Sequence, residues 1–176
     1  METHQTLENI AQNYNFVIFD TSILDATKAE RKLREEYRSK LLKTLNEYDN
    51  IFTISEVRLE SKGYTSPRYL KTMSKRRLLY YDDILAYIKP LAEGLNITRM
   101  SKEYPLTDLR LATLTLALSF HIEKTAFLSS DRELNKFIYF LIHRIKNEEH
   151  PRFPKKINQL DVYSFIQKKA SFVLTE

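Results

Sequence analysis

What this sequence of 176 residues lacks already limits what the protein can do. It has no cysteine, which excludes a disulfide framework and any thiolate metal site and fits a reducing compartment. It has no internal repeat, low-complexity tract or domain linker, and its length suits a single domain over residues 1–176. The beginning, METHQTLENIAQNYN, lacks the basic and apolar regions of a signal peptide, and no apolar run reaches the roughly 18 residues of a membrane span. We therefore expect a soluble, cytoplasmic protein with no membrane partner.

The residues that are present indicate a folded domain with a weak preference for anionic partners. Apolar residues make up 43% of the chain and aromatic residues 12%, which favours a globule with a substantial core over a disordered polymer. Lysine and arginine number 28 against 23 aspartates and glutamates, a net charge of +5. This surplus suits a polyanion, but it is also common on soluble surfaces, so charge alone does not identify the partner.

Strand-like and helix-like segments alternate along the chain. We expect strands at 16–20, 50–54, 96–100, 124–129 and near 162–165, and helices at 26–48, 55–60, 66–93, 106–120 and 132–146. Two segments, Thr53 to Glu56 and Ser130 to Glu133, have the spacing of capping boxes, and Pro90 is expected to kink or end its helix at Lys89. This alternation predicts an α/β fold, with a mainly parallel sheet covered by helices on both faces.

Two carboxylates directly follow predicted strands. Asp20 comes after FVIF, and Asp131 comes after TAFLSS. In open parallel α/β sheets, the functional crevice lies beyond the carboxyl ends of the strands. Glu60 lies one to two turns into the helix after the second strand, and Asp108 lies in the first turn of the apolar helix. The sequence therefore allows all four acids to converge on one pocket.

Such a cluster makes physical sense chiefly as a metal site. Four carboxylates in one pocket repel one another and raise their own pKa values unless a cation is present. Oxygen-only ligands suit hard cations such as Mg²⁺ or Mn²⁺. The four histidines, by contrast, are scattered without the spacing of metal ligands, and we leave them out of the site.

The segments FVIFDTS, FTISEVRLE, LTDLRLATLTLAL and FLSSDREL, in this order, resemble the PIN-domain family of metal-dependent ribonucleases over about residues 16–137. The resemblance implies a three-layer α/β/α sandwich with a central, mainly parallel sheet. A helical insert at about 66–93 and a C-terminal extension at about 147–176 extend beyond the minimal PIN core. The catalytic and metal-binding residues that the resemblance implies are Asp20, Glu60, Asp108 and Asp131, with Mg²⁺ or Mn²⁺ as cofactor and supporting roles for Thr21, Ser22 and Ser130.

The function implied by the resemblance is a metal-dependent endoribonuclease that hydrolyses RNA phosphodiester bonds. The chain has neither a cysteine nor a G-x-S-x-G motif, which agrees with a metal-activated water as the nucleophile. The family includes the VapC toxins, which dimerise and are inhibited by an antitoxin, and a ribosomal-RNA maturation endonuclease whose cysteine-built zinc ribbon this chain lacks. RNA is the expected partner, and the toxin role would add a homodimer and an antitoxin or other protein partner.

Each acid also has a purely structural interpretation. Asp20 and Asp131 suit an Asx turn or a helix N-cap, Asp108 suits a first helical turn, and Glu60 suits a solvated helix face. Two glutamates compete for the site. Glu56 shares a helix face with Glu60, and Glu133 follows Asp131 by two residues, although both fit capping boxes. The alternative function is a PIN-like RNA-binding or protein-interaction module with weak or no cleavage.

Positive charge around the acidic pocket leads to a prediction about RNA capture. Basic residues with neighbouring tyrosines can contact phosphates and stack on unpaired bases, which predicts steeply salt-sensitive binding. Replacing Arg76 and Arg77 with glutamate should weaken RNA binding for all sequences in a titration against labelled RNA, whereas unchanged affinity would exclude this patch. The basic residues of the predicted patch are Lys75, Arg76, Arg77, Lys155 and Lys156.

Overall fold

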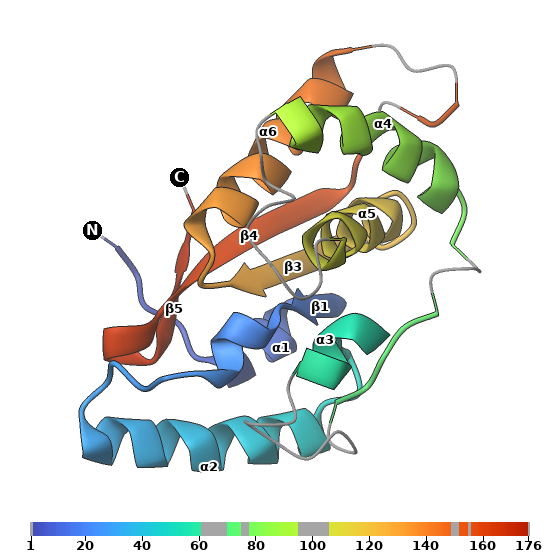
Figure 1. Cartoon of the computed structure of the whole chain (residues 1–176). Coiled ribbons are helices and arrows are strands. Elements are labelled where there is room, and N and C mark those ends of the chain that lie inside the picture. Colours follow the sequence, from blue (N-terminus) through green and yellow to red (C-terminus); the bar gives the residue numbers. More distant parts are fainter. Residues whose placement is uncertain are drawn as a thin grey trace.

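The structure of the protein, a computed structural model, describes residues 2–60, 70–74, 78–94, 106–148, 152–154 and 156–175 (Figure 1). For Leu59 and Glu60 it describes the backbone alone. Some of the predicted features lie outside these residues: the strand at 96–100 and the basic residues Lys75, Arg76, Arg77 and Lys155.

A five-stranded sheet in the order β2-β1-β3-β4-β5 forms the centre of the structure. Strands β2, β1, β3 and β4 run parallel, and β5 is antiparallel to β4. The central strand β1 is apolar along its whole length because both faces of the sheet are covered there, and Val17, Ile18 and Phe19 are fully buried. The strands are β1 (Phe16–Phe19), β2 (Ile51–Phe52), β3 (Lys124–Ser129), β4 (Gln159–Ile166) and β5 (Ser171–Leu174).

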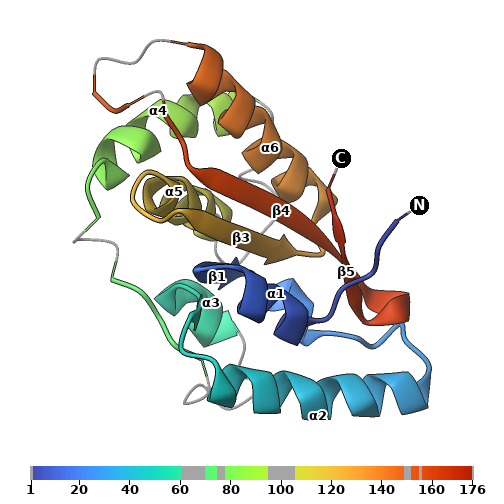
Figure 2. The same cartoon turned by 180° about the vertical axis from the view of Figure 1, so that it is seen from behind.

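Helices cover both faces of this sheet, so the predicted three-layer α/β/α sandwich is confirmed. Helices α4, α5 and α6 lie on one side, and α1 and α2 lie on the other (Figures 1 and 2). Helix α5 is buried on nearly every side, as its apolar sequence predicts. The helices are α1 (Leu7–Asn13), α2 (Arg31–Glu47), α3 (Ser55–Glu60), α4 (Tyr81–Gly94), α5 (Thr107–Ser119) and α6 (Arg132–Asn147), with short 3₁₀ helices η1 (Thr21–Leu24) and η6 (Gln167–Lys169).

The two edges of the sheet are covered by short extended segments that the sequence did not reveal. At one edge, Gln5 exchanges two backbone hydrogen bonds with Phe172 of β5, at 2.8 and 2.9 Å. At the other edge, Thr53 forms a parallel bridge with Thr72. Each bridge pairs the backbone of one edge residue, which leaves fewer unpaired backbone groups to attract another chain.

Three local predictions need correction. The helix predicted at 66–93 is wrong over residues 70–74, which are not helical and pair with Thr53 through Thr72, and the described helix begins at Tyr81; residues 66–69 and 75–77 lie outside the described residues. The same helix continues through Pro90 to Gly94, so of the two outcomes predicted for Pro90 the end at Lys89 is wrong, and a kink stays a prediction. Pro90 removes only one backbone hydrogen bond, and the helix buries apolar residues on both sides of it, including Ile88 and Ala92.

The capping box predicted at Thr53 is also wrong. In a capping box, the backbone amide of Thr53 would donate to the side chain of Glu56. In the structure, this amide donates to the carbonyl of Lys71 at 2.9 Å. The Thr53 hydroxyl donates to the carbonyl of Phe19 at 2.8 Å and so ties the end of β2 to the end of β1.

Candidate functional site

The backbone around Asp20 is fixed by the strand on one side and by η1 on the other. Its amide donates to the carbonyl of Leu128 in β3 at 3.0 Å, which continues the β1–β3 pairing one residue past the strand. Its carbonyl accepts from the amide of Ile23 at 3.2 Å, which begins η1. Asp20 therefore lies at the carboxyl end of β1, on the side of the sheet where the parallel strands end and where the sequence predicts the functional crevice.

Two serine hydroxyls hold the carboxylate of Asp20. The hydroxyls of Ser22 and Ser129 both donate to its Oδ2, at 2.9 and 3.0 Å. The same hydroxyl oxygens accept from the next loop: Ser22 Oγ from the amide of Ser130 at 2.8 Å, and Ser129 Oγ from the amide of Asp131 at 3.0 Å. The two serines therefore connect the carboxylate at the end of β1 to the backbone that follows β3.

Burial raises the pKa of Asp20 above its ordinary value, because an ionised carboxylate loses hydration in the protein. The hydrogen bonds from Ser22, Ser129 and the amide of Thr21 oppose this effect, since they stabilise the charged form. The negative charge of Asp131 raises the pKa further. Thus the neutral donors offset only part of the cost of burying the charge of Asp20, and the charge of Asp131 adds to that cost.

Asp131 is the N-cap of helix α6. Its Oδ1 accepts from the amides of Glu133 and Leu134 at 3.0 and 3.1 Å. The N-cap is therefore Asp131 and not Ser130, so the capping box predicted at Ser130 is wrong, and the structural interpretation of Asp131 as a helix N-cap is correct. The cap uses one carboxylate oxygen, and within the described residues no hydrogen bond reaches Oδ2.

The structure places the other two predicted acids on separate helices. Asp108 is buried in the first turn of α5, and Glu60 is the last residue of α3. Within the described ranges, no group of three or more histidine, aspartate or glutamate side chains is arranged to hold a metal. The structure thus brings Asp20 and Asp131 together without adding Asp108, and the site of four acids stays a prediction.

An ion pair joins the two helices that carry Glu60 and Asp108. Arg110 of α5 donates to Glu56 Oε1 of α3 at 2.6 Å. The side chain of Glu56 is only 17% exposed and that of Arg110 is 38% exposed, so solvent screens this pair less than it screens a surface pair. Glu56, which the sequence assigned to a capping box, instead connects α3 to α5.

Two residues of the network around Asp20 were not predicted from the sequence: Ser129, which contacts Asp20, and Asn135, which contacts Ser129. Ser129 donates to Asp20 through its hydroxyl, whereas the predicted supporting residue Ser130 contributes only its backbone amide to the described network. Asn135 is fully buried in α6, where its amide group donates to the carbonyl of Ser129 at 2.9 Å and to Ser164 Oγ at 3.2 Å. A signal for Asn135 was available, because it is a polar residue within the apolar stripe of α6.

The predicted basic patch has one described member. Lys156 is exposed and lies three residues before the start of β4. Because β4 is parallel to β1 and β3, it begins on the side of the sheet where these strands begin, whereas Asp20 and Asp131 lie on the side where they end. Lys156 is therefore not a neighbour of the two carboxylates.

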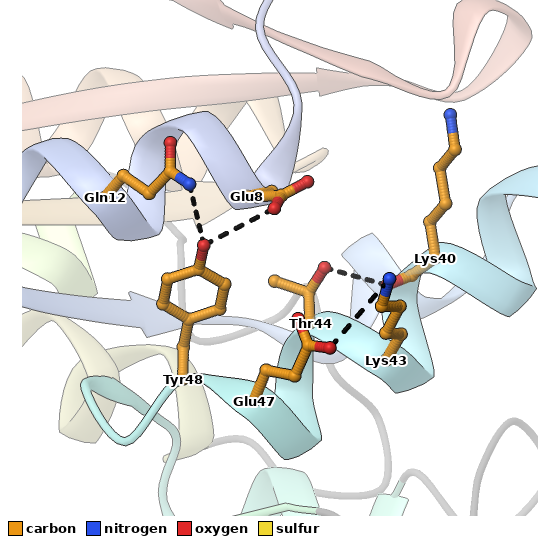
Figure 3. Close-up of polar contacts among 7 residues, drawn as sticks. All are labelled: Glu8, Gln12, Lys40, Lys43, Thr44, Glu47 and Tyr48. Atoms are coloured by element: carbon orange, nitrogen blue, oxygen red, sulfur yellow. Dashed lines mark hydrogen bonds and ion pairs between the residues drawn. The ribbon is translucent and has the colours of Figure 1, made fainter.

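A groove of about 350 Å³ lies between α1, α2 and the turn before β5, away from the acids. Its wall includes Leu7, Tyr37 and Leu41, and neither Asp20 nor Asp131 lines it. Figure 3 shows that charged groups on the rim contact one another, with Lys43 3.9 Å from Glu47. The hydroxyl of Tyr48 also accepts from Gln12 at 2.8 Å. A rim with charges of both signs does not favour an anionic ligand, so we do not place the RNA site there.

Comparisons of the chain with protein-family models, with curated proteins and with solved structures find no match. In the described part of the chain, no helix is long and apolar enough to cross a membrane.

The Glu56–Arg110 pair gives a prediction about stability. Replacing Glu56 with glutamine should lower the free energy of unfolding by about 1–2 kcal/mol, because Arg110 then keeps a half-buried charge without its partner. This value lies between the cost of losing an exposed pair, about 0.2–1 kcal/mol, and that of breaking a buried one, about 3–5 kcal/mol. The measurement is urea denaturation, with Glu47→Gln as the control for an exposed pair. Equal midpoints for the two variants would show that the α3–α5 pair contributes no more than an exposed pair and would contradict this prediction.

Proposed function

We propose that the protein is a metal-dependent endoribonuclease whose site is centred on Asp20 and Asp131. The observation that carries this proposal is the pair of interacting carboxylates at the ends of β1 and β3, one of which is held by Ser22 and Ser129. Burial raises the pKa of Asp20, and no lysine or arginine of the described chain forms an ion pair with it. A carboxylate placed in this way is stabilised when a cation binds beside it.

The donors at this position fit a small divalent cation. Mg²⁺ is commonly held by one or two carboxylates and retains several waters, and Asp20 and Asp131 supply two carboxylates. The helix cap uses only Oδ1 of Asp131. Glu60 and Asp108 are the further ligands that the resemblance to PIN domains implies. When bound, the ion would lower the pKa of a coordinated water and neutralise charge on the phosphate oxygens.

The chain itself contributes orientation. The hydroxyls of Ser22 and Ser129 fix the carboxylate of Asp20. The same hydroxyl oxygens accept hydrogen bonds from the amides of Ser130 and Asp131, and these bonds hold the end of β1 beside the end of β3. The Asn135 side chain in turn holds the carbonyl of Ser129. These contacts keep both carboxylates in place before a substrate arrives, which is what preorganisation requires.

One observation favours a second candidate function. Among the described side chains, which do not include that of Glu60, no third acidic group joins the two carboxylates. A PIN-like module that binds RNA or protein with weak or no cleavage would have such an incomplete site, and this is the alternative that the cleavage assay tests.

The proposed activity is tested by incubating purified protein with labelled RNA in Mg²⁺ or Mn²⁺, with and without a chelator. We expect cleavage that the chelator abolishes and that Asp20→Asn reduces by at least about a hundredfold, because the variant loses a metal ligand. Ser129→Ala should reduce cleavage by about ten- to a hundredfold, because Asp20 loses one of the two hydroxyls that orient it.

The matched control is Asp49→Asn, because the Asp49 side chain is 99% exposed and far along the chain from the site. It should cleave like the wild-type protein. Asp20→Asn should also be at least as stable as the wild type without a divalent cation, since a neutral amide is less costly to bury than a carboxylate. Cleavage that survives Asp20→Asn would indicate another active site, and RNA binding without any cleavage would support the module.

A further inference from the structure

The outward side of helix α6 carries only cationic, aromatic and amide side chains across a continuous stripe. In a helix with 3.6 residues per turn, positions 132, 136, 139, 140, 143, 146 and 147 fall within one third of the circumference. All seven are exposed, and the buried residues of α6 occupy the opposite side. We call this stripe the outer face of α6; it consists of Arg132, Lys136, Tyr139, Phe140, His143, Lys146 and Asn147.

Two adjacent aromatic rings are exposed on this face. Tyr139 and Phe140 are each 42% exposed, and they are the only aromatic residues among the large hydrophobic side chains exposed in the described part of the chain. The Tyr139 ring contacts His143 edge to face, with ring centroids 4.8 Å apart, and the Arg144 guanidinium lies 5.7 Å from the centre of the Phe140 ring. These contacts orient the two rings, and part of the surface of each ring remains exposed to solvent.

The charge on the outer face has a single sign. Arg132, Lys136 and Lys146 form no ion pair within the described residues. The acids of this helix region lie off the stripe: Glu133 is at its margin, and Glu148 is paired with Arg144 at 3.1 Å. A row of unpaired cations beside exposed rings complements a flexible polyanion that carries planar groups, because phosphates pair with the cations and bases stack on the rings.

The position of the face connects it to the proposed site. Helix α6 begins directly after its cap residue Asp131, and Figures 1 and 2 show the helix on the outside of its layer. At 1.5 Å per residue, Tyr139 lies about 12 Å along the helix from Asp131. A flexible polyanion bound along this face would therefore extend toward the carboxylates of Asp20 and Asp131.

We infer that the outer face of α6 binds single-stranded RNA, a role that rests on the proposed function and identifies the substrate as unpaired RNA. Tyr139 and Phe140 stack on bases, while Arg132, Lys136 and Lys146 contact phosphates. Recognition of this kind depends on unpaired bases and on salt, and it tolerates different sequences.

The test measures binding without cleavage, by fluorescence anisotropy of a labelled single-stranded RNA of mixed sequence in chelator. Tyr139→Ala and Phe140→Ala should each weaken binding by about tenfold, whereas Tyr139→Phe should stay within about twofold because the ring remains. Lys136→Ala should reduce the slope of log affinity against log salt by about 0.7, because one phosphate contact is lost. The controls on α2 are Leu42→Ala, an exposed apolar residue, and Lys32→Ala, an exposed lysine.

The outcomes separate this inference from the proposed function. Weaker binding by the two alanine variants, with Tyr139→Phe and the α2 controls unchanged, supports the RNA face even if no cleavage is ever found. Unchanged affinity in both alanine variants overturns it, even if Mg²⁺-dependent cleavage is intact. If the alanine variants keep their RNA affinity but change from a dimer to a monomer in solution, the face binds a second copy of the chain and the inference is wrong. Absence of RNA binding by the wild-type protein also overturns it.

Discussion

The hydrogen bonds from Ser22 and Ser129 to Asp20 are the contacts on which the candidate site depends. A carboxylate at the end of a buried strand is costly unless donors replace the water that it loses. The two hydroxyls supply those donors, and they also accept the amides of Ser130 and Asp131. The ends of β1 and β3 are therefore held together by polar contacts as well as by strand pairing, and the second carboxylate is set beside the first.

The same network gives Asp131 two roles that do not exclude each other. As the N-cap of α6, it satisfies two backbone amides with a single oxygen, which stabilises the start of a helix packed on the sheet. Its charge also acts on Asp20 and raises the pKa of that carboxyl. Two neighbouring negative charges at the edge of a parallel sheet, next to a helix with a cationic outer face, form an arrangement that a divalent cation and a polyanion would each complement.

The layers of the fold could be predicted from the sequence because they follow from hydrophobic pattern. FVIF and KTAFLS are apolar enough for strands covered on both faces, and the apolar α5 could only be an internal helix. Features set by contacts between distant residues could not be predicted in this way. Thr53 was assigned to a cap because its spacing fits one, but Lys71 takes its amide at the sheet edge. Ser129 could not be predicted because only the pairing of β1 with β3 brings it to Asp20. Asn135 is recognisable in the sequence as a polar residue in an apolar stripe, but only the packing of α6 places it against Ser129.

The central claim is that Asp20 and Asp131 together bind a divalent cation. The most direct measurement is anomalous diffraction from crystals of the protein soaked in Mn²⁺, because it locates the ion without assuming any activity. We predict a single strong peak within coordination distance of a carboxylate oxygen of Asp20 and of Oδ2 of Asp131. Density that shows no ion at these two carboxylates, or an ion bound only elsewhere on the protein, would contradict the claim.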